Sequence, residues 1–256
     1  LLWCVAEEYR DALTPARASA LAALVAAGDP LGRPVAVHHA TGDTTFDFTG
    51  DRHVPIFAQQ PRADSVEALH AEVLAAVRHV DGKAIVHMAE NWNHRSNDLA
   101  LKGDHAACVA HGDRAGVRQR NWAVAMAGAT CQVIGPWEGS SGDKPATPGM
   151  LADMRSLIRF FSAVPLHELA PQDELAFGDA CWVLASEDGA KTVAYALAGQ
   201  GKLEIRVASG RYVARWLDCA TGEGVEIPAT APRGTLALPR PAGIGAECAV
   251  YLERQR

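Results

Sequence analysis

The first 165 residues contain short apolar runs that are continuous rather than alternating with polar residues. These runs cover residues 1–5, 34–39, 54–60, 83–90 and 130–135. A continuous apolar run is typical of a parallel strand that is covered on both faces, and helices are the usual connections between such strands. Each run is also closed or followed at once by polar or ionisable side chains. The pattern therefore predicts up to five strand-helix units with polar groups at the C-terminal ends of their strands.

Capping residues indicate where the connecting helices begin and end. Thr14 and Pro15 are typical of a helix start, and Gly28 of a helix end. Asp64 and Glu67 have the spacing of a capping box at the start of a second helix. Two further helices are predicted within residues 113–128 and 146–164.

The sequence changes character after about residue 170. Short apolar stretches are separated there by Gly, Ser, Asp and Pro, and no helical pattern intervenes. This texture is typical of a small antiparallel β-domain, such as a sandwich. We therefore predict an α/β domain over residues 1–168, followed by a β-sandwich domain over residues 169–256.

Composition argues against several classes of protein. The formal net charge is −6, whereas nucleic-acid binding needs a clustered basic face. No apolar run approaches the roughly 20 residues of a membrane-spanning helix. The six cysteines are scattered without a CxxC pair, which favours neither a zinc-cysteine site nor a disulfide framework.

Two glutamates stand at matching places in the strand pattern. Glu8 follows the first run and Glu90 ends the fourth. In a barrel of parallel strands the C-terminal strand ends build the active site, and ends three strands apart face each other across its mouth. Glycoside hydrolysis needs two facing carboxyl groups, one to protonate the leaving oxygen and one to attack the anomeric carbon. Either glutamate could instead be a solvated loop residue or an ion-pair partner.

Two segments resemble strands of the clan A glycoside hydrolases. "LWCVAEE" is similar to the fourth barrel strand of that clan, with Glu8 in the position of the acid/base and Glu7 in place of the usual Asn. "GKAIVHMAENW" is similar to the seventh strand, which implies that Glu90 is the nucleophile. By this resemblance the chain holds strands four to eight of a (β/α)8 TIM barrel. We expect such a part to show little activity alone, because it cannot close the barrel.

A closer resemblance is to the apiosidase-like family of glycoside hydrolases. It rests on "GDPLGRPVAVHH", "FDFTGD" with "VPIFAQQ", "NWAVAMAGATCQVIG" and "RSLIRFFSAVPLHELAPQDEL", in this order. Members often carry a C-terminal β-domain described as collagen-binding, and "YVARWLDCATGE" is similar to a stretch of that domain. The resemblance implies a glycosidase domain followed by this β-domain.

Further polar and aromatic residues stand at or beside the strand ends. They could bind the hydroxyl groups of a sugar or stack on its ring, although each could equally serve packing or a loop. This set comprises Glu7, His38, His39, Gln59, Gln60, Asn91, Trp92 and Trp137. His38, His39 and His87 together could instead indicate a metal-dependent hydrolase, but the sequence has neither an HxH nor an HExxH spacing.

The two glutamates and the clan resemblance predict a retaining O-glycoside hydrolase, and the apiosidase-like resemblance implies that it acts on plant-type or other polysaccharide or oligosaccharide side chains. We expect a carbohydrate substrate and neither a cofactor nor a metal. A polysaccharide substrate would favour a secreted or periplasmic location. Two alternatives stay open: a non-catalytic carbohydrate- or matrix-binding protein on a degenerate barrel, and a metal-dependent TIM-barrel hydrolase.

Overall fold

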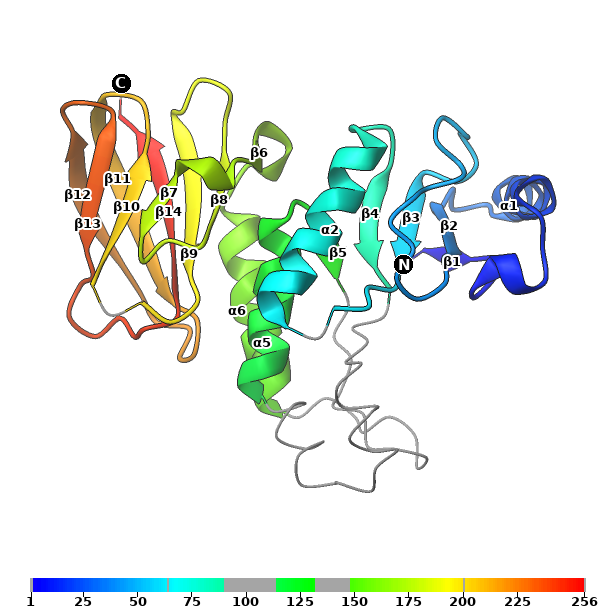
Figure 1. Ribbon diagram of the computed structural model, residues 1–256, viewed down its shortest axis with the longest axis horizontal. Coiled ribbons are helices and arrows are strands. Elements are labelled where there is room, and N and C mark those ends of the chain that lie inside the picture. Colours follow the sequence, from blue (N-terminus) through cyan, green and yellow to red (C-terminus); the bar gives the residue numbers. More distant parts are fainter. Residues whose placement is uncertain (1, 64, 90–113, 132–147, 200, 256) are drawn as a thin grey trace. The chain divides into compact units, whose positions relative to one another are not determined.

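The computed structural model describes residues 2–63, 65–89, 114–131, 148–199 and 201–255. The chain divides into two compact units, Leu1–Pro145 and Ala146–Arg256, which are described separately below (Figure 1). This division places helix α6 (Pro148–Ser162) in the second unit. The sequence-based boundary after residue 168 stays a prediction.

The first unit is built on one parallel sheet of five strands. Its strands follow one another in chain order and all pair in parallel. They are β1 (Trp3–Cys4), β2 (Val35–His38), β3 (Ile56–Gln59), β4 (Ile85–Met88) and β5 (Thr130–Cys131). Each of the five predicted runs contains one of these strands. The prediction of parallel strands is thereby confirmed.

Three helices of the first unit lie within the described residues, and their starts partly follow the predicted caps. They are α1 (Pro15–Gly28), α2 (Val66–Val80) and α5 (Arg114–Met126), together with the short 3-10 helix η1 (Tyr9–Asp11). The Thr14 side chain accepts a hydrogen bond from the backbone N–H of Arg17, as predicted for an N-cap. Helix α2 is capped by Ser65, whose hydroxyl accepts from the N–H of Ala68 at 3.1 Å, rather than by the predicted Asp64.

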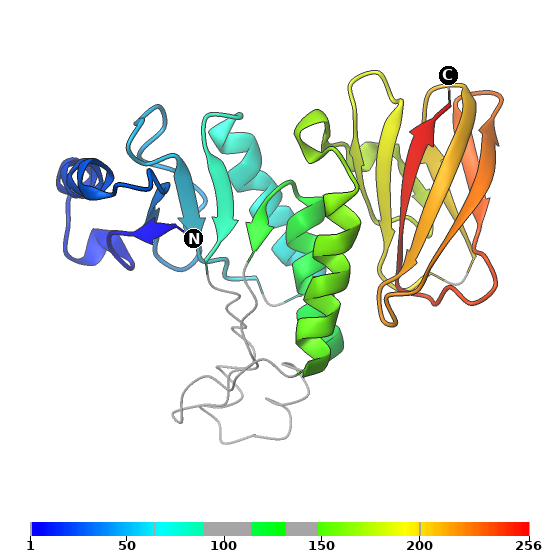
Figure 2. The same ribbon diagram turned by 180° about the vertical axis from the view of Figure 1, so that it is seen from behind.

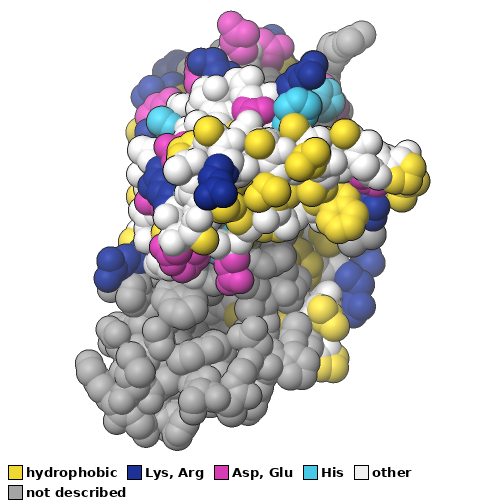
Figure 3. Space-filling model, turned by 90° about the vertical axis from the view of Figure 1, so that its right-hand side faces the viewer, with side chains coloured by type: hydrophobic (Ala, Val, Ile, Leu, Met, Phe, Trp, Pro, Cys, Tyr) yellow, Lys and Arg dark blue, Asp and Glu magenta, His cyan; other side chains and the backbone are white. Residues whose placement is uncertain are grey.

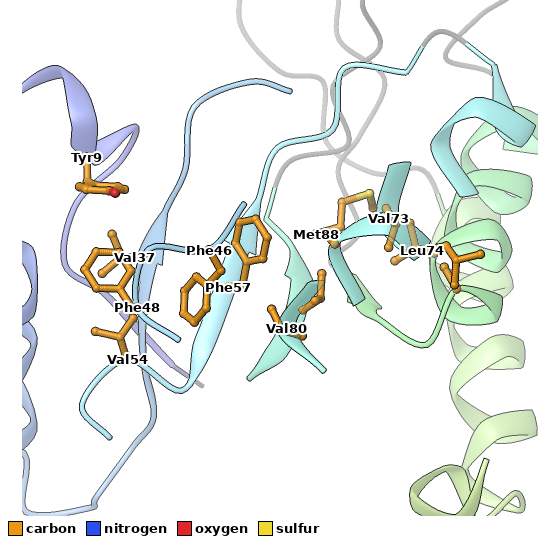
Figure 4. Packing of buried hydrophobic residues seen from close by; sticks show 14 of the residues in the cluster. Tyr9, Val37, Phe46, Phe48, Val54, Phe57, Val73, Leu74, Val80 and Met88 are labelled. Atoms are coloured by element: carbon orange, nitrogen blue, oxygen red, sulfur yellow. The ribbon is translucent and has the colours of Figure 1, made fainter. Parts of the chain in front are cut away.

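The two faces of the parallel sheet carry different side chains. One face carries Val37, Phe57 and Met88, which join Val73 and Val80 of α2 in the main hydrophobic core (Figure 4). The opposite face, called the small-residue face below because Ala36 and Ala58 lie on it, carries its side chains in two rows given by the strand register. One row is Ala36, Ile56 and Ile85, and the other is His38, Ala58, His87 and Thr130.

The second unit consists of α6 and two antiparallel sheets that share one hydrophobic core. One sheet has the order β13-β10-β7 and the other β12-β11-β14-β9-β8-β6 (Figure 2). Leu203 and Leu236 from the first sheet pack with Ala194, Trp216 and Val250 from the second. The strands are β6 (Ala170–Pro171), β7 (Ala176–Gly178), β8 (Trp182–Ala185), β9 (Lys191–Ala196), β10 (Lys202–Arg206), β11 (Gly210–Asp218), β12 (Gly224–Ala231), β13 (Thr235–Pro239) and β14 (Cys248–Arg254), with 3-10 helices η3 (Leu166–Glu168) and η4 (Asp173–Leu175).

The fold is thus mixed α/β, with a parallel sheet first and antiparallel sheets after it. Within the described residues the parallel sheet ends at β1 on one side and β5 on the other. Closure into a (β/α)8 barrel stays a prediction. None of the described helices is both long and apolar enough to cross a membrane.

Candidate active site

An open hollow of about 430 Å³ lies on the small-residue face of the parallel sheet. Its floor is formed by alanines of β2 and β3, and its polar walls by groups from three different strands or strand ends. The lining residues are Leu2, Cys4, Glu7, Ala36, His38, Ala58, His87 and Ala89. The sequence had indicated polar groups at the strand ends, and the structure brings Glu7, His38 and His87 together here.

The turn at Glu7 and Glu8 has an unusual backbone. Glu8 has φ 41° and ψ 52°, the left-handed conformation that disfavours a residue with a Cβ by roughly 1–2 kcal/mol. Its backbone N–H donates a hydrogen bond to Nδ1 of His38 over 3.3 Å. Its carboxylate Oε1 accepts from the hydroxyl of Thr41 over 3.5 Å. The neighbouring strand β2 and the loop after it therefore contact Glu8 through both its backbone and its side chain.

The residues directly after Glu8 anchor this turn to the loop between β2 and β3. Tyr9 is fully buried, and its hydroxyl donates to the carboxylate of Asp47. Arg10 forms ion pairs with Asp43 at 2.8 Å and with Asp47 at 2.6 Å. Burial, followed by the bond to Asp47, raises the pKa of Tyr9 to about 12. Burial of Asp47 opposes its ionisation, but the hydrogen bonds from Tyr9 and Arg10 outweigh it and lower the pKa of that carboxyl.

The two histidines of the hollow stand on either side of Ala58. The register pairs His38 with Ala58 and Ala58 with His87, so the two rings project from the same sheet face two strands apart. Nδ1 of His87 lies 2.9 Å from the hydroxyl of Thr130 on β5. Burial lowers the pKa of both rings; the nearby carboxylates of Glu7 and Glu8 oppose the shift at His38, whereas His38 adds to it at His87. Both rings therefore favour the neutral form.

His39, Gln59 and Gln60 are buried and do not line the hollow. His39 is 0 % exposed and packs among aromatic rings of the main core, with ring centroids 4.5 Å from Phe57 and 5.1 Å from Tyr9. Burial lowers its pKa to about 4. Gln59 donates through Nε2 to the backbone carbonyl of Asp43 at 3.4 Å, inside the loop that Arg10 holds.

Four predicted site residues lie outside the described residues: Glu90, Asn91, Trp92 and Trp137. The separation between the carboxyl groups of Glu8 and Glu90 therefore stays a prediction. Among the residues that the structure does describe, no group of three or more His, Cys, Asp or Glu side chains is placed to hold a metal ion. His38 and His39 are adjacent in sequence and belong to the hollow and to the main core respectively, so the three histidines considered for a metal site do not converge.

A second hollow, of about 580 Å³, lies in the second unit and is larger. Its walls include Glu168, Asp188, Lys191, Glu253 and Arg254. These charges mostly satisfy one another or other neighbours, as in the 2.6 Å ion pair between Lys191 and Glu168. The smaller hollow is the better candidate because its polar groups include the ring of His38, whose buried Nε2 has no hydrogen-bond partner within the described part of the chain.

Sequence reasoning missed the residues that hold the site together. Thr41, Tyr9 and Arg10 contact or anchor the Glu8 turn, but each stands in a polar stretch without a strand or helix pattern. The available signal was the tyrosine in "EEYRD", a large ring directly after two carboxylates, because such a ring is usually buried.

The fold is similar to that of solved glycoside hydrolases. One is a glycoside hydrolase family 5 protein from Bacteroides vulgatus, at 13% identity and a TM-score of 0.64, with 99% of this chain and 62% of that chain covered. Another structure, described as a glycoside hydrolase, has 14% identity and a TM-score of 0.62, with 99% and 64% covered. This chain thus spans less than two thirds of either structure. No protein-family model matches the sequence, and no curated protein matches it.

Proposed function

We propose that this chain is part of a retaining glycoside hydrolase, with Glu8 as general acid/base and Glu90 as nucleophile. The observation that carries the proposal is the fixed Glu7–Glu8 turn at the end of a parallel strand, beside a hollow floored by alanines. The likeness in fold to glycoside hydrolases supports it. The substrate would be a polysaccharide or oligosaccharide side chain, as the apiosidase-like resemblance implies.

The mechanism assigns each carboxyl group a task in two steps. Glu90 would attack the anomeric carbon while Glu8 protonates the leaving oxygen, which forms a covalent glycosyl-enzyme intermediate. Glu8 would then take a proton from the water that hydrolyses this intermediate. Retention requires the two carboxyl groups to be about 5–5.5 Å apart. Glu7 and His38 line the hollow and would bind sugar hydroxyl groups, with Asn91, Trp92 and Trp137 completing the site.

Exposed apolar side chains on β1 and α1 support a larger domain around this part. Trp3 is 42% exposed, Leu24 is 70% exposed, and Leu31, just after α1, is 74% exposed. Figure 3 looks onto the α1 end of the first unit and shows apolar side chains spread across this face. Further strand-helix units of a barrel would cover it. We therefore expect the full-length protein to be active and the 256-residue chain alone to be nearly inactive.

Azide rescue in the full-length protein tests the two roles. Substrates would be a panel of 4-nitrophenyl glycosides, whose good leaving group reduces the need for an acid. Azide should restore turnover in both Glu8→Ala and Glu90→Ala. With Glu8→Ala the glycosyl azide should keep the anomeric configuration of the substrate, because azide attacks the intermediate. With Glu90→Ala it should have the opposite configuration, because azide replaces the nucleophile.

The matched control is Glu7→Ala, which removes the carboxylate adjacent to Glu8. It should weaken substrate binding without giving any glycosyl azide. Inverted products from both catalytic variants, or unchanged hydrolysis of an oligosaccharide by Glu8→Ala, would contradict the assignment. No hydrolysis of any glycoside by the full-length protein would favour the non-catalytic alternative.

A further inference from the structure

We propose that His38 is the positioning residue for Glu8, acting as a neutral imidazole that carries its proton on Nε2. This inference rests on the proposed function only in its kinetic consequence. Its structural basis is the hydrogen bond in which the backbone N–H of Glu8 donates to Nδ1 of His38 over 3.3 Å. A ring nitrogen can accept only when it carries no proton, so the neutral ring must be protonated on Nε2.

The ring of His38 accepts a backbone hydrogen bond just after the strand pairing of β1 ends. The backbone N–H of Val5 donates to the carbonyl of Ala36, and the N–H of His38 donates to the carbonyl of Ala6. Beyond Ala6 the chain turns away, and the N–H of Glu8 would lose a backbone acceptor. Nδ1 of His38 supplies that acceptor, so a side chain on β2 fixes the backbone that follows β1.

The backbone conformation at Glu8 needs this support. Within the described residues only Glu8 and Asp81 have positive φ without being glycine. Asp81 follows the last turn of α2, where the left-handed conformation is a common helix ending, and its N–H bonds back to Val77. Glu8 does not follow a helix, so its left-handed conformation does not complete a helix ending. The contact with His38 is the polar contact that the structure records for its N–H.

His38 is itself well held in the neutral state. The ring is 4 % exposed and lies in the row between the β1 strand end and Ala58. The ionisable groups around it within the described chain are Cys4, Glu7 and Glu8 on the β1 side and His87 on β4. Burial lowers the pKa of His38, and the two glutamates oppose this shift. A second proton would place an N–H at Nδ1, facing the N–H of Glu8, and would release the turn.

The consequence for the reaction follows from the double task of Glu8. The same carboxyl group must donate a proton in the first step and accept one in the second. A turn that is free to move would misplace it in both steps. Loss of the His38 bond should therefore reduce kcat more than it raises KM.

Two substitutions separate the two ring nitrogens. The amide oxygen of Asn can occupy the place of Nδ1, so His38→Asn keeps an acceptor for the N–H of Glu8. The longer Gln places its amide near Nε2, so His38→Gln lacks that acceptor. In the full-length protein we expect kcat to be roughly 100-fold lower in His38→Gln than in His38→Asn, the scale of a misplaced catalytic group.

Two readouts do not depend on activity. Nitrogen-15 NMR of labelled histidine should show His38 protonated on Nε2 and not on Nδ1. Hydrogen exchange at the Glu8 amide should be slow in wild type and in His38→Asn and faster in His38→Gln. His87→Asn is the matched control, because His87 lies beyond Ala58 and should leave exchange at Glu8 unchanged.

The outcomes distinguish this inference from the proposed function. A proton on Nδ1 of His38, or equal exchange at Glu8 in the Asn and Gln variants, would overturn the positioning role even in an active glycosidase. The predicted tautomer and exchange pattern in a protein that hydrolyses no glycoside would leave the positioning role intact and refute the proposed function. An active enzyme in which the Asn and Gln variants have the same kcat would remove the kinetic consequence.

Discussion

The buried ring of His39 predicts that the first unit loses stability as the pH falls. Its side chain is fully buried, and burial lowers its pKa from 6.5 to about 4. Between these two values the unfolded chain binds a proton that the folded unit does not, so stability is complete above pH 6.5 and declines below it. At roughly 1.4 kcal/mol for each pH unit in this window, the free energy of unfolding should fall by about 3 kcal/mol.

The assay is urea unfolding between about pH 7.5 and pH 4.5, where most of the loss falls. Hydrogen exchange of peptides from β2 and β3 would report the first unit alone. His39→Phe keeps a ring in the aromatic cluster and should remove this share of the pH dependence, with His39→Met as a second variant. His79→Gln, at an exposed position on α2, is the control and should keep it. If His39→Phe lost as much stability below pH 6.5 as wild type, the reasoning would be wrong.

Two substitutions test the packing of each unit. Phe57→Ala should lower the free energy of unfolding of the first unit by about 3–5 kcal/mol, since the fully buried ring leaves a cavity; hydrogen exchange of β2 peptides measures this. Tyr212→Phe should lower that of the second unit by about 1 kcal/mol, because its hydroxyl loses the 2.7 Å bond to the carbonyl of Ala208. Hydrogen exchange of β11 peptides in increasing urea would report it, and an unchanged midpoint would mean that water replaces the bond.

The parallel sheet was predictable because its strands appear in the sequence as short, continuous apolar runs. Parallel strands joined by helices typically give such runs, with polar positions close to the strand ends. The runs around Val35–His38, Ile56–Gln59 and Ile85–Met88 show this pattern, and the structure pairs all three in parallel. The antiparallel strands after residue 170 were predictable from a different signal, the Gly, Ser, Asp and Pro residues that separate them.

It was harder to predict which face of the sheet each side chain at a strand end lies on. Side chains alternate across a strand, so only one of His38 and His39 can face the hollow, and the sequence has no marker for which one. The structure assigns His38 to the hollow and His39 to the aromatic core. The N-cap of α2 was also missed. Asp64 and Ser65 are both good N-cap residues, and the helix begins one residue later than predicted.

The small side chains on one face of the parallel sheet leave the space in which the candidate site lies. Ala36 and Ala58 leave space above the sheet where larger side chains would have filled it, and Ile85 in the same layer is 56% exposed. A face of this kind is poorly suited to pack against another helix layer but well suited to line a cavity that polar groups rim. Glu7, His38 and His87 are those groups, and the Glu8 turn stands at the same rim. The role of His38 can be tested apart from catalysis at this rim, because it can be read at the single backbone amide of Glu8.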